Sequence, residues 1–97
     1  MVLEIAQITA QPGKIEELRA GLVAAISVIR RAEGCHSVTV RQQIEDPSQF
    51  ILQIEWETLE HHTVTFRGGP LFAEYRSHIT GLFVDPIVAR HYQQVDA

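Results

Sequence analysis

The chain contains one cysteine, Cys35, among its 97 residues, which excludes an internal disulfide and a cysteine-based zinc site. It also lacks any run of lysine or arginine, and its net charge is -4, so it lacks the basic stripe that nucleic-acid binding usually needs. No apolar run reaches membrane-spanning length. Met1 leads directly into strand-like sequence, without the basic, apolar and small-residue order of a signal peptide. We therefore expect a cytoplasmic protein whose partners include neither nucleic acid nor a membrane.

Motifs for cofactors and metals are also missing. The chain has no Gly-x-Gly-x-x-Gly sequence, and the "RGG" at residues 67–69 lacks the strand, turn and helix context of a phosphate loop. The five histidines include no His-x-x-x-His pair. We expect no flavin or nicotinamide cofactor and no metal site.

The composition is that of one folded domain covering residues 1–97. Hydrophobic residues make up 45% and charged residues 21% of the chain, as in ordinary globular proteins. A chain of this size buries a core, but much of the surface of its sheet needs a second copy to cover it. We expect self-association.

The first half of the chain predicts a strand, a helix and a hairpin. Residues 1–10 are rich in β-branched and aliphatic residues and read as a strand. Between Pro12 and Glu33, apolar residues recur every three or four positions, which predicts a helix, and Gly34 lies where a left-handed cap is common. Residues 36–45 and 49–57 read as two strands joined by the turn sequence "DPS".

The second half predicts a broken helix and a last strand. Thr58 is a plausible N-cap for a short helix that "RGGP" ends, and a further helix runs from Pro70 to Thr80. Residues 87–95 read as the final strand. This order is the α+β, ferredoxin-like βαββαβ split sandwich, with a broken second helix. Helices cover one face of such a sheet, so the other face favours a homodimer.

Four segments carry a family resemblance: "PGKIEELRAGL", "GCHSVTV", "EDPSQFILQIEWETLEHH" and "FRGGPLFAEYR". They resemble successive landmarks of the antibiotic biosynthesis monooxygenase superfamily, and they cover nearly the whole chain. The resemblance implies a dimeric α+β barrel. It identifies the scaffold rather than the substrate, because the superfamily includes cofactor-independent oxygenases of phenols and quinols, haem-degrading enzymes and an isomerase of a phosphorylated sugar.

The resemblance also implies site residues. The segment "WETLEHHTVTFRGGPLFAEYR" is similar to the one that places a His and an Arg beside the pocket, and here these are His62 and Arg67, with Trp56 and Phe66 as neighbours. Two departures from the family are visible. Gln7, Phe66 and Arg76 stand where the haem-degrading branch is expected to have Asn, Trp and His, which disfavours haem degradation. "RGGP" replaces a serine before the proline, which alters a helix cap.

Helix geometry restricts which of these residues can face a pocket, and side-chain chemistry suggests their roles and adds further candidates. Adjacent helical residues project about 100° apart, so only one of His61 and His62 can face a pocket. An imidazole with an ordinary pKa near 6.5 can accept a phenolic proton, and an arginine can stabilise the anion that remains. The residues expected to contact a substrate are Trp56, Phe66, Phe72, Tyr75 and His78.

The leading hypothesis is therefore a cofactor-independent monooxygenase of a small aromatic or quinol-type substrate, with His62 and Arg67 as catalytic residues. An isomerase or other proton-transfer enzyme on a small anionic carbonyl compound would use the same pair, with Arg76 or Arg41 holding the anionic group. The third hypothesis is a non-catalytic dimeric ligand-binding or stress-associated protein.

Overall fold

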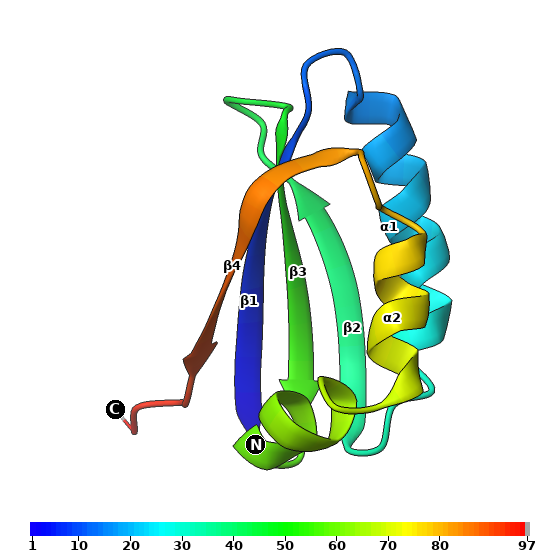
Figure 1. The fold of residues 1–97 in the computed structure, drawn as a ribbon. Helices are drawn as coiled ribbons and strands as arrows, with labels where there is room; N and C mark the ends of the chain where they lie inside the picture. Colours follow the sequence, from blue (N-terminus) through cyan, green and yellow to red (C-terminus); the bar gives the residue numbers. More distant parts are fainter. Residues whose placement is uncertain (97) are drawn as a thin grey trace.

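The computed structural model describes residues 1–96, which form one sheet with helices on one of its faces (Figure 1). The elements follow the order β1 (Val2–Ala10), α1 (Ile15–Ile29), β2 (Cys35–Gln42), β3 (Gln49–Trp56), η1 (His61–Phe66), α2 (Pro70–Ser77) and β4 (Phe83–Tyr92). The sheet is antiparallel throughout, with the strand order β2-β3-β1-β4. This confirms the predicted α+β ferredoxin-like fold.

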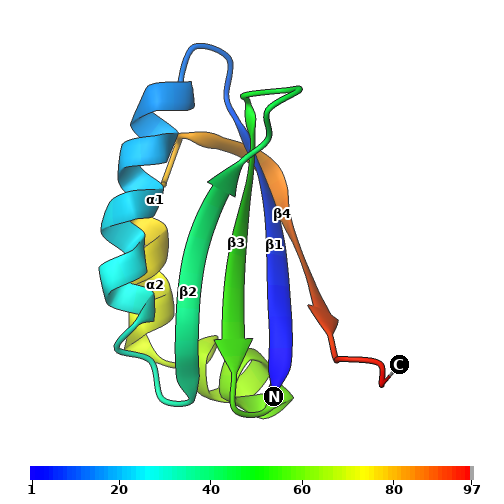
Figure 2. The same ribbon diagram turned by 180° about the vertical axis from the view of Figure 1, so that it is seen from behind.

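The helices lie together on one side of the sheet, and the view from behind shows its other face without any helix (Figure 2). Alternation along the strands decides which residues meet the helices. On β3, Phe50, Leu52, Ile54 and Trp56 are buried, whereas the residues between them are only partly buried. On β1, the buried set is Glu4, Ala6, Ile8 and Ala10.

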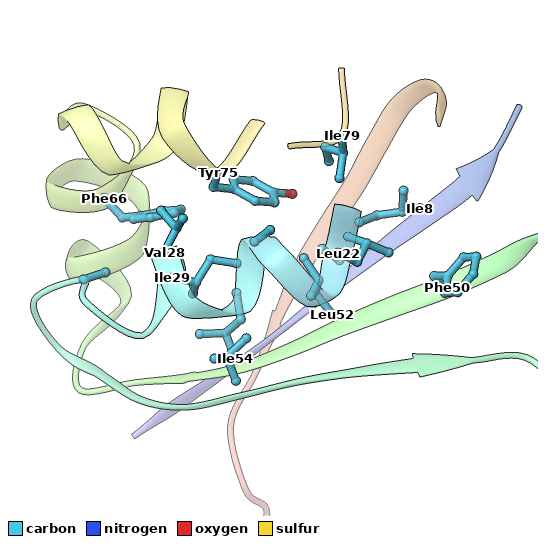
Figure 3. Close-up of a cluster of buried hydrophobic side chains, with 14 of the residues drawn as sticks. Ile8, Leu22, Val28, Ile29, Phe50, Leu52, Ile54, Phe66, Tyr75 and Ile79 are labelled. Atoms are coloured by element: carbon cyan, nitrogen blue, oxygen red, sulfur yellow. The ribbon is translucent and has the colours of Figure 1, made fainter. Parts of the chain in front are cut away.

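The core lies between the sheet and the helices (Figure 3). Leu22 and Ile29 of α1 are completely buried against Ile8 and Leu52 of the sheet. Burying a side chain of this kind contributes roughly 1.5–3 kcal/mol. Phe66 and Tyr75 close the same core from the side of η1 and α2 (Figure 3).

Several boundaries differ from those predicted. Helix α1 ends at Ile29 because Arg31 and Ala32 already form tighter turns, and Gly34 has the left-handed φ of 81° expected of a cap. Helix α2 ends at Ser77 rather than at Thr80. Strand β4 begins at Phe83, earlier than predicted, because Phe83 and Val84 pair with Ala10 and Thr9.

The short helix after β3 is capped by Thr58, whose hydroxyl oxygen accepts a hydrogen bond from the amide of His61 at 3.2 Å. Its following turns are wider than an α-helix. The amide of Arg67 donates to the carbonyl oxygen of His62 at 3.1 Å, a spacing of five residues, so η1 is a π-helix. Segments of this kind are frequent at functional sites. None of the helices formed by residues 1–96 has the length and apolar character needed to cross a bilayer.

Candidate functional site

The two adjacent histidines of η1 face different surroundings. His62 is 3% exposed, and its ring stacks on Trp56 with the ring centroids 5.5 Å apart and the planes 15° from parallel. The ring of His61 instead lies beside Gly34, and its Nδ1 contacts the Thr58 hydroxyl at 2.7 Å. His62 is thus the histidine inside the fold.

Each nitrogen of the His62 ring has a titratable neighbour. Nδ1 lies 2.7 Å from Nε2 of His91 on β4, a hydrogen bond in which one ring donates and the other accepts. Nε2 lies 3.4 Å from Oε1 of Glu4 on β1. The ring therefore connects a strand in the middle of the sheet with a strand at its edge.

Glu4 is a carboxylic acid in a core position, with 5% of its surface exposed. Because β1 alternates, Glu4 shares the buried face of Ala6, Ile8 and Ala10. Its Oε1 accepts a hydrogen bond from the indole Nε1–H of Trp56 at 2.9 Å, and the same oxygen faces His62. The structure gives Oε2 no comparable partner among residues 1–96, which leaves this oxygen free for a bound molecule.

Burial shifts the pKa values of His62 and Glu4 in opposite directions. Burial, with smaller contributions from His91 and Arg67, lowers the pKa of His62 to about 4, so the ring is neutral at pH 7. Burial raises the pKa of Glu4 above its ordinary value, although the hydrogen bond from Trp56 and the charge of Arg67 oppose this shift. The pKa of His91 is lowered by its partial burial and then by Arg67. Burial thus makes His62 a weaker base and Glu4 a stronger one.

Arg67 follows η1 and is exposed, but it also lines the cavity beside Glu4 and His62. None of the ion pairs formed within residues 1–96 includes it. Its positive charge nevertheless lowers the pKa of His62 and that of His91, and it favours the ionised form of Glu4. A cation at the edge of a buried acid-base pair can hold an anionic ligand.

The cavity itself is small, with a volume of about 20 Å³. Its polar lining comes from Glu4, His62, Arg67, Tyr75 and Arg76. A volume of this size holds about one water molecule. An aromatic substrate therefore requires the cavity to widen.

The aromatic side of the cavity comes from η1 and α2. Phe66 meets Phe72 edge to face with the ring centroids 5.7 Å apart, and it lies 6.1 Å from Tyr75. Burial raises the pKa of Tyr75, so its hydroxyl stays protonated at neutral pH. The guanidinium carbon of Arg76 lies 4.9 Å from the centre of the Phe72 ring, and the buried Arg76 Nε has no hydrogen-bond partner within residues 1–96. Phe72 and Arg76 are both only partly buried, so they form the outer side of the cavity.

Most of the residues predicted for the site come together. The predicted residues that line the cavity are His62, Phe66, Arg67, Phe72 and Tyr75. Trp56 does not line it, but stands behind His62 and binds Glu4.

His78 lies outside this group. It follows the last residue of α2, and its side chain is exposed. The backbone of α2 approaches α1 at this point, since a Cβ added at Gly21 would collide with the His78 carbonyl oxygen. The structure does not bring His78 to the cavity, because its side chain is turned to the solvent, so its substrate contact stays a prediction.

Two residues of the site were not predicted. Glu4 could have been found from the alternation of β1, which puts an acid in phase with small and aliphatic core residues. His91 could not, because it reaches the site through its pairing with Glu4 across β1 and β4, two strands far apart in sequence.

Comparisons with known proteins agree on one family. The sequence profile of the antibiotic biosynthesis monooxygenase family matches residues 1–77. A crystal structure of a candidate antibiotic biosynthesis monooxygenase from Bordetella bronchiseptica is 37% identical, with a TM-score of 0.92 over 97% of this chain and 96% of that one. The uncharacterised protein YczJ of Bacillus subtilis (strain 168) is 27% identical over 98% of this chain and 100% of its own length.

A more distant structure has the same fold. SnoaB, a cofactor-independent oxygenase from Streptomyces nogalater, has a TM-score of 0.80 over 99% of this chain and 94% of its own, at 11% identity. This likeness concerns the fold alone. The profile match and the close Bordetella structure go further, and they show that this chain belongs to the antibiotic biosynthesis monooxygenase family.

Proposed function

We propose that this protein is a cofactor-independent monooxygenase of a small phenol or quinol, acting as a homodimer. The observation that carries the proposal is the polar wall of the cavity, where a buried carboxyl group and a neutral imidazole lie beside an unpaired arginine. Family membership supports the reaction class, and SnoaB is an oxygenase of the same fold.

The sequence suggested His62 as the group that takes the phenolic proton, but its surroundings favour Glu4. The drop in the pKa of His62 from 6.5 to about 4 makes protonation of this ring about 3 kcal/mol less favourable than that of an ordinary histidine. Both ring nitrogens also face protein partners. Glu4 has a raised pKa and one oxygen without a partner, so we assign proton abstraction to Glu4, with His62 fixing its position.

The other residues of the cavity would stabilise the anion, exclude water and donate a hydrogen bond to the substrate. Arg67 would stabilise the phenolate once the proton has moved to Glu4. Phe66 and Phe72 would exclude water from the electron-rich ring. Tyr75 would offer a protonated hydroxyl as a donor to the substrate.

The reaction balances without a further reductant. The phenolate attacks O₂ through a ring carbon that bears a hydrogen, which forms a C–O bond, and the resulting peroxide takes back the proton held by Glu4. Cleavage of the O–O bond with loss of the remaining C–H proton gives a carbonyl group and one water molecule. The substrate supplies all four electrons, and the protein supplies position, charge and a reversible proton acceptor.

The test is enzyme-dependent oxygen uptake. Metal-stripped protein would be incubated with hydroquinones, anthrones and catechols, each measured against its own autoxidation. We expect uptake with at least one compound, and a loss of about 100-fold or more in Glu4→Gln, which keeps the size of the side chain. His62→Ala should also lose uptake.

A matched control is His36→Ala, which removes an exposed histidine on β2 that pairs with Glu57. It should keep the wild-type rate. Loss of a substrate C–H proton to deuterated solvent without oxygen uptake would instead support the isomerase hypothesis. Equal rates in wild type and Glu4→Gln would contradict the proposal.

A further inference from the structure

Three titratable side chains form a continuous chain from the cavity to the surface. Glu4 on β1 lines the cavity and is 5% exposed, and His62 on η1 is 3% exposed. His91 on β4 does not line the cavity and is only partly buried, so its second ring nitrogen, Nδ1, is the one directed away from His62. The two links are 3.4 Å, from Glu4 Oε1 to His62 Nε2, and 2.7 Å, from His62 Nδ1 to His91 Nε2.

We infer that Glu4, His62 and His91 form a proton relay through which the carboxyl group in the cavity exchanges its proton with solvent at the surface of β4. Glu4 is only 5% exposed, and the cavity beside it has room for about one water molecule, so solvent has only narrow access to the carboxyl group. The two imidazoles supply a second route, through hydrogen-bonded rings, to the surface at β4.

The donor and acceptor rules allow two arrangements of the chain. A neutral imidazole has one N–H donor and one acceptor nitrogen. When Glu4 is ionised, His62 donates through Nε2–H to Glu4, and His91 donates through its own Nε2–H to His62 Nδ1. When Glu4 is protonated, every donor reverses: the carboxyl group donates to His62 Nε2, His62 Nδ1–H donates to His91 Nε2, and His91 carries its proton on Nδ1.

The two arrangements differ by one proton. A proton added from solvent at His91 Nδ1 moves the Nε2 proton of His91 to His62 Nδ1, and the Nε2 proton of His62 to Glu4. Neither ring holds a positive charge at the end. This suits His62, whose burial disfavours the imidazolium form and lowers its pKa to about 4.

The longer link is within reach of a hydrogen bond. A typical N–H···O distance is 2.7–3.2 Å, so the 3.4 Å separation must shorten by a few tenths of an ångström. Catalytic hydrogen bonds are often long in unliganded sites. Trp56 restrains both groups, because it stacks on the His62 ring and donates to the same Glu4 oxygen.

The other ionisable groups around the relay keep one state near neutral pH. Arg67 and Arg76 face it from the segment after η1 and from α2 and supply permanent positive charge. Burial raises the pKa of Tyr75 on α2 above 10 and that of Cys35 on β2 above 9, so both stay neutral. A titration of the site between pH 8 and 4 therefore reports the three relay residues.

The relay is a property of the resting protein, and only its catalytic use rests on the proposed function. In that function Glu4 must be ionised before a phenol arrives. Burial raises the pKa of Glu4 and so favours its protonated form, and the relay gives this proton a path to solvent before the substrate binds.

The test follows the histidine tautomers by NMR in the full chain labelled with ¹⁵N-histidine. Two-bond ¹H–¹⁵N correlation spectra between pH 8 and 4 distinguish Nε2–H, Nδ1–H and imidazolium rings. We expect His62 and His91 to change from Nε2–H to Nδ1–H together, with one midpoint. A His91 ring that becomes imidazolium while His62 keeps its tautomer would overturn the relay.

Two variants sharpen this test. In Glu4→Gln the new side chain still has an oxygen that accepts the hydrogen bond from Trp56, so His62 should stay in the Nε2–H tautomer wherever its ring is neutral. His91→Gln should slow the exchange between the two tautomers of His62, because an amide cannot pass a proton on. His36→Gln should leave it intact, and backbone amide spectra would show that each variant is folded.

An activity measurement separates the relay from the function. With a substrate in hand, His91→Gly should lose oxygen uptake and regain it with added imidazole. Uptake in this variant equal to that of wild type would overturn the catalytic use of the relay. If wild type consumes no oxygen, the proposed function fails, and the NMR result still decides the relay.

Discussion

Glu4 on β1 and His91 on β4 are paired directly across the sheet, and both side chains reach the ring of His62. The acid-base wall of the cavity therefore depends on strand register as well as on the helix that carries His62. A slip of one residue between β1 and β4 would turn one member of the pair to the opposite face of the sheet.

Acid should destabilise the protein through His62. Its folded-state pKa of about 4 is below the ordinary 6.5, so its contribution to stability is complete above pH 6.5 and is lost as the pH falls through 4. The loss is at most about 3 kcal/mol. His62→Phe, which keeps an aromatic ring beside Trp56, should show a smaller decrease in unfolding free energy between pH 7 and 4.

Urea unfolding followed by the fluorescence of Trp56, the single tryptophan, measures this difference. The comparison uses the change in unfolding free energy between pH 7 and pH 4 in each protein, because Glu4 and His91 also contribute to it. As the pH falls, Glu4 opposes the loss caused by His62, and His91 adds to it. His36→Gln should keep the wild-type pH dependence. An equal decrease in wild type and His62→Phe would contradict the buried, neutral state of His62.

Gly34 should tolerate alanine less well than Gly13, although both have a left-handed backbone, with φ values of 81° and 77°. The conformation alone costs a non-glycine residue roughly 1–2 kcal/mol. A Cβ at Gly34 would also collide with the His61 ring, whereas a Cβ at Gly13 meets nothing within 4 Å. Gly34→Ala should therefore have the lower unfolding free energy of the two variants.

A double variant separates the clash with the His61 ring from the cost of the left-handed backbone. His61→Ala removes the ring that Gly34→Ala displaces, so the cost of Gly34→Ala should fall to that of Gly13→Ala in this background. Thermal and urea unfolding measure both costs. If Gly34→Ala costs the same with and without His61, the packing of this ring against the loop is not what requires glycine.

Local patterns made most of the fold predictable. Alternation on β3 and the helical spacing of Leu18, Leu22 and Ile29 identified these elements, because each signal lies within one segment. The π-helical form of η1 was missed, because six residues are too few to distinguish a spacing of four from one of five. The position of His78 could not be read from a local pattern either. It depends on where α2 ends and on how α2 approaches α1.

The site was predictable only in part, for a physical reason. The family resemblance identified the segment of His62 and Arg67, and η1 places both beside the cavity. The partners of His62 come from other strands. Glu4 carries a visible signal in the alternation of β1, whereas His91 requires the register of β4, which shifts between Gln7 and Thr9. No local pattern in the sequence contains that shift.

The helix-free face of the sheet should form the proposed homodimer interface (Figure 2). Ile51, Gln7 and Val88 lie in one row across β3, β1 and β4, and the two aliphatic residues are only partly buried. A charge placed there would have to be desolvated on association. Ile51→Lys should therefore give monomers in analytical ultracentrifugation at concentrations where wild type is dimeric.

Val23 supplies the control for that experiment. It lies on α1 and is 58% exposed, so Val23→Lys makes the same kind of change on the opposite side of the molecule. This variant should stay dimeric. Monomers with Val23→Lys and dimers with Ile51→Lys would assign the interface to the helices instead.

Glu4→Gln should stabilise the protein and at the same time abolish its activity. Burial raises the pKa of Glu4 in the folded state above the ordinary value of 4.5, so stability is complete below pH 4.5 and is lost as the pH rises through the folded-state pKa. Glutamine avoids this loss and still accepts the hydrogen bond from Trp56. The variant should therefore be more stable than wild type at pH 7, with the advantage disappearing below pH 4.5.

The combination of the two effects identifies a functional acid rather than a structural one. A carboxylate kept only for packing would be destabilising to replace, whereas residues kept for chemistry often reduce stability. Glu45→Gln makes the same substitution at an exposed position and should change the unfolding free energy by less than about 0.5 kcal/mol. Urea unfolding at pH 7 and pH 4, beside oxygen uptake, completes the test. A Glu4→Gln variant that is less stable at pH 7 and equally active would assign Glu4 to the core and remove it from the chemistry.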